Sequence, residues 1–182
     1  SHKNAKRGMV VSKDRGRWGV VLDEDGTLVT CMRAREMGRT NVVVGDHVSV
    51  VGDTSGKKDT LARIVRLEDR TSILRRTADD TDSFERIVVA NADYLLIVSA
   101  VADPPPRTGF VERALIAAFV GGLTPLVCLT KSDLADPSAF AAEFRDLDVE
   151  VLTTGVSDSL DELAEHITGK VSALVGHSGV GK

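Results

Sequence analysis

The segment at residues 176–182 reads Gly-His-Ser-Gly-Val-Gly-Lys and matches the phosphate-loop pattern G-x-x-x-x-G-K. Glycines let successive backbone N–H groups wrap around an anion, and the lysine can reach the β- and γ-phosphates of a nucleotide. The apolar run Val171–Val175 supplies the strand that should precede such a loop. The pattern predicts a phosphate site, with a glycine-rich turn as the alternative. The candidate phosphate-binding residues are Gly176, His177, Ser178, Gly179, Val180, Gly181 and Lys182.

A second polar segment, Thr130, Lys131, Ser132 and Asp133, directly follows the apolar run Pro125–Leu129. A carboxylate at the C-terminal edge of a parallel sheet is well placed to meet a ligand. Asp133 could accept both N1–H and the exocyclic amine of guanine, whereas adenine offers no such pair of donors, and Lys131 could stack its stem along the base. Capping of the next helical turn by Ser132 or Asp133 is the alternative. Beside a phosphate loop, the segment favours guanine recognition.

Strands that alternate with helices must hold these two segments in place. Tyr94–Ala100 is a continuous apolar run, as expected for a strand covered on both faces. Further strands are predicted at Pro125–Leu129, Glu150–Thr153 and Val171–Val175. Helices are predicted at Phe110–Val120, Ser138–Phe144 and Ser159–Ile167, with Phe110, Leu115 and Phe119 as the core stripe of the first. The alternation predicts βαβ units and a parallel sheet, which makes this half a candidate α/β nucleotide-binding fold.

The first 68 residues show a different pattern of short apolar runs between turn signals, which is typical of an all-β domain. In the fourth run, Asp46, Val48 and Val50 fall on one side of the predicted strand. Five strands in so short a segment predict a small closed barrel such as an OB-fold, and an SH3-like barrel gives nearly the same pattern. The predicted strands are Gly8–Lys13, Trp18–Asp23, Thr27–Arg33, Asp46–Val51 and Leu61–Leu67.

These patterns predict an α+β multidomain protein: an OB-fold β-barrel at residues 1–68, a linker at 69–86, and an α/β P-loop domain at 87–182. The acidic, polar stretch 77–83 within the linker is expected to be mobile or to become ordered with a partner.

Charge is divided unequally between the two halves. Residues 1–76 contain 16 Lys and Arg against 10 Asp and Glu, a net +6, and residues 77–182 carry a net −10. The basic half could approach a polyanion such as RNA, and a solvated basic face is the alternative. The candidate RNA-binding residues are Arg15, Arg17, Arg33, Arg35, Arg39, Arg70, Arg75 and Arg76.

Composition excludes several classes of protein. The chain has 182 residues, 42% of them hydrophobic and 27% charged, which rules out wholesale disorder and a disulfide scaffold. Two cysteines in apolar runs, Cys31 and Cys128, suit a reducing compartment, and with four scattered histidines they cannot form a structural zinc site. No apolar run approaches the roughly 20 residues of a membrane span. We expect a cytoplasmic monomer that makes no membrane contact.

In combination, the motifs resemble a GTPase whose segments are rotated, with base recognition first and the phosphate loop last. The barrel, residues 70–75 (Arg-Thr-Ser-Ile-Leu-Arg), residues 89–93 (Val-Ala-Asn-Ala-Asp) and the phosphate loop resemble the circularly permuted RsgA/YjeQ family of ribosome-small-subunit-dependent GTPases, from about Gly8 to Lys182. The resemblance implies an OB barrel, a permuted GTPase domain and a C-terminal zinc-binding domain. It also implies GTP or GDP with Mg²⁺ as ligands, the 30S subunit and its 16S rRNA as partners, and GTP hydrolysis stimulated by the subunit late in its maturation.

The resemblance also assigns roles to individual residues. It places the phosphate loop at residues 176–182 and base recognition at residues 130–133. Thr153 and Thr154 stand where the family usually has Ser-Ala, whose backbone contacts the guanine carbonyl. Thr130 replaces the usual Asn, which removes a side-chain amide that braces the base pocket.

Other parts of the family's machinery are expected beyond Lys182. These are the Mg²⁺-binding Ser or Thr, the switch segments, the Asp-x-Pro-Gly motif and the zinc ligands. We therefore assign no catalytic residue and no metal ligand within residues 1–182, and expect this chain to lack the parts that hydrolysis needs.

Three functions compete on this evidence. The first is a GTP-hydrolysing ribosome-assembly factor whose barrel binds 16S rRNA. The second is an RNA-binding module that senses nucleotide without catalysis. The third is a P-loop ATPase or kinase in which the Thr130–Asp133 segment occurs by accident.

Overall fold

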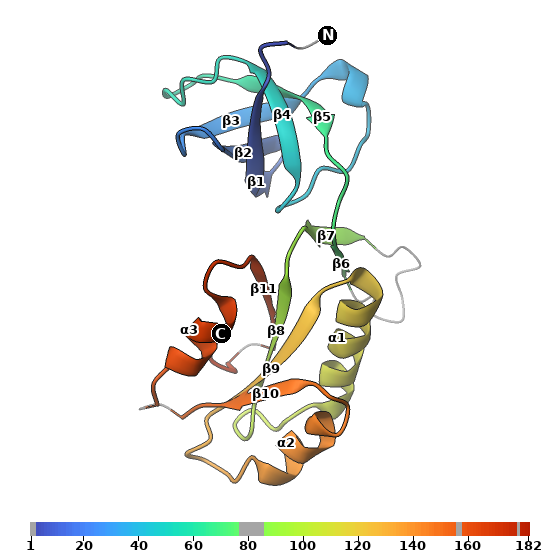
Figure 1. The fold of residues 1–182 in the computed structure, drawn as a ribbon, viewed down its shortest axis with the longest axis vertical. Coiled ribbons are helices and arrows are strands. Elements are labelled where there is room, and N and C mark those ends of the chain that lie inside the picture. Colours follow the sequence, from blue (N-terminus) through green and yellow to red (C-terminus); the bar gives the residue numbers. More distant parts are fainter. Residues whose placement is uncertain (1–2, 77–85, 156–157, 178) are drawn as a thin grey trace. The chain divides into compact units, whose positions relative to one another are not determined.

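The computed structural model describes residues 3–76, 86–155, 158–177 and 179–182 (Figure 1). The chain divides into two compact units. The first contains residues 1–73 and 86–91, and the second contains residues 74–85 and 92–182.

The first unit contains a closed five-stranded barrel, with strand order β1-β2-β3-β5-β4 (Figure 1). β3 and β5 pair in parallel, and the other neighbours are antiparallel, including β1 with β4, which closes the barrel. The strands are β1 Lys6–Asp14, β2 Arg17–Leu22, β3 Leu28–Arg33, β4 His47–Gly52 and β5 Ala62–Leu67. The barrel predicted from the spacing of apolar runs is confirmed.

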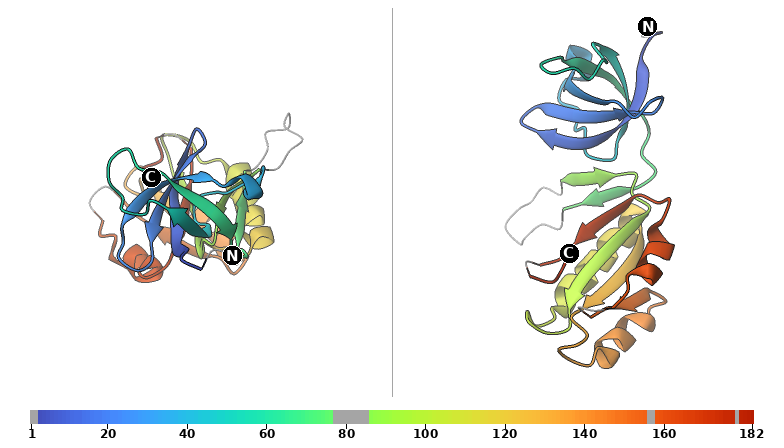
Figure 2. Two further views of the ribbon diagram at one scale, coloured as in Figure 1. Left: turned by 90° about the horizontal axis from the view of Figure 1, so that it is seen from above. Right: turned by 90° about the vertical axis from the view of Figure 1, so that its left-hand side faces the viewer.

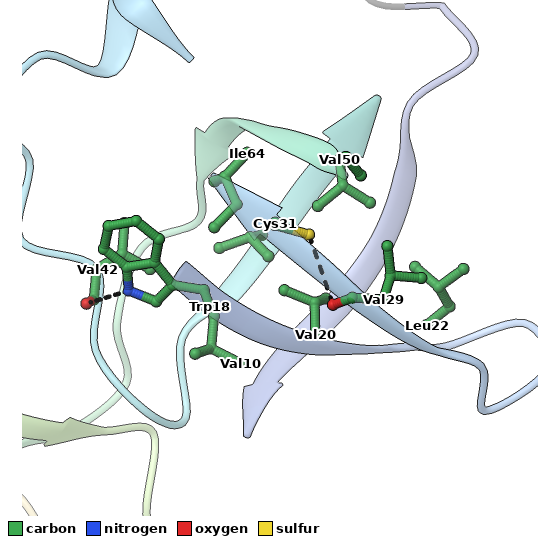
Figure 3. Packing of buried hydrophobic residues seen from close by; sticks show 11 residues of the cluster. Val10, Trp18, Val20, Leu22, Val29, Cys31, Val42, Val50 and Ile64 are labelled. Atoms are coloured by element: carbon green, nitrogen blue, oxygen red, sulfur yellow. Dashed lines mark hydrogen bonds between the residues drawn. The ribbon is translucent and has the colours of Figure 1, made fainter. Parts of the chain in front are cut away.

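Alternating apolar side chains fill the barrel (Figure 3). Val48 and Val50 of β4 are fully buried, and so is Asp46 just before the strand. Trp18 is only 3% exposed, and its indole N–H donates to the carbonyl of Val42 at 2.9 Å. The indole therefore belongs to the core and offers no face to a nucleic-acid base.

Three short elements were not foreseen from the sequence. A 3₁₀ helix, η1, covers Arg35–Met37, and β6 (Ile73–Arg75) forms a two-stranded sheet with β7 (Ile87–Ala90). β6 lies within the segment 69–86 that was predicted to be a linker. The acidic stretch 77–83, for which mobility was predicted, lies outside the described residues.

The second unit contains a parallel sheet of four strands in the order β10-β9-β8-β11 (Figure 2). Its strands are β8 Tyr94–Ala100, β9 Thr124–Thr130, β10 Glu150–Thr153 and β11 Ser172–Val175. Since all four run in parallel, their carboxyl ends lie at one edge. The predicted α/β architecture is confirmed.

Three helices connect these strands: α1 (Thr108–Gly121), α2 (Ser138–Arg145) and α3 (Asp161–Ile167). α1 packs on β8 and β9, and α2 packs on β10. α3 contributes Leu163 and Ile167 to a core cluster on the sheet.

The predicted core stripe of α1 was wrong at Phe119, which is 58% exposed. The buried residues are Val111, Ala114, Leu115 and Ala118, spaced i, i+3, i+4 and i+7. Two alanines on this face let the helix approach the sheet closely, and Phe119 falls beside the face and not on it. Phe110 is half-buried, and Leu115 is buried as predicted.

Candidate functional site

The phosphate loop and the segment 130–133 lie at the same edge of the sheet. β9 ends at Thr130, the first residue of the candidate base-recognition segment, and β11 ends at Val175, one residue before Gly176. β10 ends at Thr153, so the third predicted segment is also at this edge. Parallel pairing thus brings together three segments that are far apart in the sequence.

A direct hydrogen bond joins two of these segments. The hydroxyl of Thr130 donates to the backbone carbonyl of Val180 within the phosphate loop. Sequence reasoning treated Thr130 only as the loss of an amide and missed this contact. The signal available in the sequence was a hydroxyl residue at the end of a strand, which is too common to indicate a partner.

The conformation of the loop depends on its glycines. Gly179 and Gly181 have positive φ angles of 82° and 91°, which L-residues with a Cβ rarely adopt. Gly176 is constrained by space, because a Cβ there would lie 2.8 Å from the carbonyl oxygen of Val98. The ammonium group of Lys182 donates to the carbonyl of Gly176 at 2.6 Å, across the mouth of the loop. Ser178, also predicted to bind phosphate, lies outside the described residues.

Val180 anchors the loop to the sheet. Its side chain is 3% exposed and packs in a cluster with residues of β8, β9 and β10, among them Val98 and Cys128. Burial of an apolar side chain in the middle of a polar loop fixes the loop against the sheet.

His177 contacts α1 through its imidazole ring. Its ring lies 4.5 Å, centroid to centroid, from that of Phe110. A cavity of about 210 Å³ adjoins it, lined also by Pro104, Arg107 and Val180. Its Nε2 atom is buried and makes no hydrogen bond with any part of the chain that the structure describes.

The segment 130–133 is held by backbone and side-chain bonds. Lys131 has a φ of 59°, and its ammonium group donates to the carbonyl of Asp103 in the loop after β8. The N–H of Ser132 donates to the carbonyl of Thr154 at 3.1 Å. A Cβ at Gly155 would lie 3.2 Å from Oδ1 of Asp133, so a small residue leaves room for that carboxylate.

Thr153 and Thr154 occupy different environments. Thr153 ends β10 and is exposed, whereas Thr154 is half-buried. The N–H of Thr154 donates to the carbonyl of Leu129 at 2.8 Å, which extends the β9–β10 pairing beyond the strands. The backbone of Thr154 therefore connects the 130–133 segment to β10.

The candidate RNA-binding arginines of the barrel gather at one end. Arg15 lies in the β1–β2 turn and Arg17 begins β2. Arg33 ends β3, which pairs with β2 beside that turn. Arg33 lies 5.1 Å above the Trp18 ring and donates to the carbonyl of Thr40 at 2.6 Å, so its guanidinium is partly committed. The other candidates at exposed positions are Arg35, Arg39, Arg75 and Arg76.

Arg70 is committed to the first unit. Its guanidinium pairs with the buried carboxylate of Asp46, and its side chain is 15% exposed. The hydrogen bond to Asp46 raises the pKa of Arg70 above its usual range. Nearby, Asn91 accepts the N–H of Thr71 at 2.8 Å and donates to the carbonyl of Gly45 at 2.9 Å. Within the first unit, Asn91 therefore links Thr71 to Gly45 of the barrel.

The described residues include few side chains suited to metal binding or redox chemistry. Within the described ranges, no group of three or more His, Cys, Asp and Glu side chains is placed to hold a metal ion. Cys31 and Cys128 are buried free thiols, and burial raises their pKa values to about 12 and about 11. None of the helices in the described residues is long and apolar enough to cross a membrane.

Comparisons with known proteins agree with this geometry. A family model described as RsgA GTPase matches residues 67–182. The chain is 34% identical to the small ribosomal subunit biogenesis GTPase RsgA of Gemmatimonas aurantiaca, covering 96% of this chain and 59% of the relative. It is 29% identical to the protein of the same name from Chlorobaculum parvum, covering 95% of this chain and 60% of that one.

Solved structures show the same architecture. YjeQ from Thermotoga maritima superposes with a TM-score of 0.73 at 26% identity, covering 98% of this chain and 62% of that one. YloQ, a circularly permuted GTPase, has a TM-score of 0.71 at 21% identity, covering 99% and 62%, which shows a shared fold. The chain thus spans about 60% of the length of the relatives that it matches.

Proposed function

The chain belongs to the RsgA GTPase family, and from this premise we propose that it is a guanine-nucleotide-binding factor that acts on the small ribosomal subunit. The observation that carries the proposal is the meeting of the phosphate loop and the segment 130–133 at one sheet edge, joined by the bond from Thr130 to Val180.

Each segment has a separate role in nucleotide binding. The backbone N–H groups of residues 176–182 would surround the phosphates, and Lys182 would move from the carbonyl of Gly176 to the β- and γ-phosphates. Asp133 would accept the two adjacent donors of guanine, and the stem of Lys131 would lie along the base. The backbone of Thr154 would face the guanine carbonyl, with Ser132 and Thr153 beside it.

These groups would bind and orient the nucleotide, but GTP hydrolysis requires further groups. Phosphoryl transfer requires Mg²⁺ to neutralise charge and a group that orients the attacking water. The described residues offer Lys182 and backbone donors for the phosphates, so we assign nucleotide binding to residues 1–182 and no catalytic residue. The zinc implied by the family resemblance is likewise assigned to none of them.

The basic end of the barrel is the proposed contact with 16S rRNA. Arg15, Arg17, Arg35 and Arg39 are exposed there and could reach phosphates. Trp18 is buried, which favours phosphate and shape recognition over base stacking. Arg70 is held by Asp46 and would orient the neighbouring segment instead of binding RNA.

Sedimentation with purified 30S subunits tests this function. We expect binding that is stronger with a non-hydrolysable GTP analogue than with GDP, and that weakens steeply as salt rises. Replacing Arg15 and Arg17 by Ala should weaken binding to the subunit. The matched control replaces Lys57 and Lys58 by Ala; these exposed residues lie in the β4–β5 loop, at the opposite end of the barrel. The control variant should bind as tightly as the wild type. Subunit binding that is the same with the GTP analogue and GDP, and at low and high salt, would contradict the proposal.

An RNA-binding module that senses nucleotide without hydrolysis is the second candidate. The same site favours this candidate, because its described residues include groups that could bind a nucleotide and none to which we assign catalysis. Subunit binding that responds to GTP without any GTP turnover on the subunit would select it over the GTPase.

A further inference from the structure

We propose that Thr130 is a positioning residue for the phosphate loop, and that its hydroxyl donates no hydrogen bond to the base. The inference rests on the proposed binding of a guanine nucleotide at this sheet edge. It concerns the role of Thr at position 130, where the family usually has Asn.

The hydroxyl of Thr130 is already engaged. A hydroxyl carries one proton, and that of Thr130 is donated to the carbonyl of Val180. Guanine presents the acceptors N7 and O6 on one edge and the donors N1–H and N2–H on another. With its proton committed to the loop, Thr130 has no donor for the acceptor edge.

Thr130 also lies beside the next residue of the loop. Gly181 has a φ of 91°, and a Cβ on it would lie 3.9 Å from Cβ, Cγ2 and Oγ1 of Thr130. The threonine side chain therefore forms a hydrogen bond with Val180 and lies on the side of Gly181 where a Cβ would stand.

The backbone of Thr130 is fixed from the other side. It pairs with Ala100 across the β8–β9 ladder, and its carbonyl accepts the N–H of Val101 at 3.0 Å. Val180 in turn is anchored by its buried side chain. The hydrogen bond therefore joins two constrained positions and holds the loop amides in place before a phosphate arrives, which lowers the ordering cost of binding.

The test compares GTP with 7-deaza-GTP, which lacks the N7 acceptor, on the wild-type full-length protein and on Thr130→Val and Thr130→Ser. Thr130→Val keeps the shape and removes the hydroxyl, so it should weaken both nucleotides by the same factor, about 3- to 10-fold. Thr130→Ser keeps the hydroxyl and should restore most of the affinity. Thr124→Val, at the exposed opposite end of β9, is the matched control and should change neither affinity.

Several outcomes would overturn the inference. If Thr130→Val binds as tightly as the wild type, the hydrogen bond does not position the loop. If the wild type prefers GTP to 7-deaza-GTP and Thr130→Val abolishes that preference, the hydroxyl reads the base. If the valine variant does not fold, Thr130→Ala replaces it in the same comparison, because it also removes the hydroxyl. Failure of the proposed function looks different, because the wild type would then show no preference for GTP over ATP.

Discussion

Arg70 forms a two-pronged ion pair with the fully buried carboxylate of Asp46. Its Nε lies 2.8 Å from Oδ1 and its Nη2 lies 2.9 Å from Oδ2. The same carboxylate accepts the N–H of Val43 at 2.8 Å, and Nη2 also donates to the carbonyl of Asn41 at 2.6 Å. A carboxylate buried among these partners becomes costly when the guanidinium is removed.

Arg70→Met should therefore destabilise the first unit by about 3 kcal/mol, because it leaves the Asp46 carboxylate buried without its countercharge. Trp18, the one tryptophan, lies in the barrel core, so its fluorescence during urea unfolding reports on this unit. Arg15→Met removes an equal charge from a side chain that is 95% exposed and should change stability by less than about 0.5 kcal/mol. Equal effects of the two variants would refute the structural role of the pair.

Gly176→Ala should weaken binding of GTP and GDP by about 10-fold or more. The added Cβ would lie 2.8 Å from the carbonyl oxygen of Val98, so either the loop or β8 must move, and the loop's N–H groups lose their alignment. Gly109→Ala in α1 is the control, since its Cβ would meet only the flexible Arg113 side chain at 3.3 Å. Titration with a fluorescent GDP analogue measures both, and unchanged affinity in Gly176→Ala would contradict the close approach.

Asp133→Asn should move base preference from guanine towards xanthine. The amide can donate to the oxygen that xanthine carries in place of the exocyclic amine, while it loses the charged acceptor for guanine. We expect GTP affinity to fall about 10- to 100-fold, with XTP binding gained.

Asp136→Asn is a matched control, because it removes the same charge three residues away, where the carboxylate bonds to Ser138. Competition assays with GTP and XTP separate the two. If base preference is unchanged in Asp133→Asn, the carboxylate only caps the following turn.

The two buried thiols give a prediction about alkaline pH. Burial raises the pKa of Cys31 to about 12 and that of Cys128 to about 11, above the value of either thiol in an unfolded chain. Their contribution to stability is therefore complete below about pH 9 and is lost as pH rises toward 11 to 12, because the unfolded thiols ionise first.

At pH 8, both cysteines should resist a thiol reagent in the native protein and react in urea. Rapid labelling of either cysteine in the native protein at that pH would contradict the burial of its sulfur.

Much of this fold could be predicted from sequence because its elements have strong local signals. Tyr94–Ala100 and Glu150–Thr153 were predicted with the boundaries that the structure shows, since apolar runs bounded by loop residues define buried strands well. Parallel pairing then placed their carboxyl ends together. The short β6 and β7 were missed because three or four residues carry too little periodicity to distinguish a strand from a loop.

The rest depended on contacts between distant residues. Nothing near Arg70 in the sequence shows that its charge is used by Asp46, 24 residues away, so it was grouped with the exposed arginines. The indole of Trp18 donates to the carbonyl of Val42, which is also 24 residues away in the sequence. Thr130 stands 50 residues from Val180, and only the sheet brings them together.

Competition between GTP and ATP for a fluorescent guanine nucleotide bound to the wild-type protein tests the central claim most directly. If the edge formed by β9, β10 and β11 is a guanine-nucleotide site, GTP should displace the probe at least about 100-fold more effectively than ATP, because adenine lacks the paired donors for Asp133. Equal displacement by ATP would contradict the account, and would leave the phosphate loop as a site without base recognition.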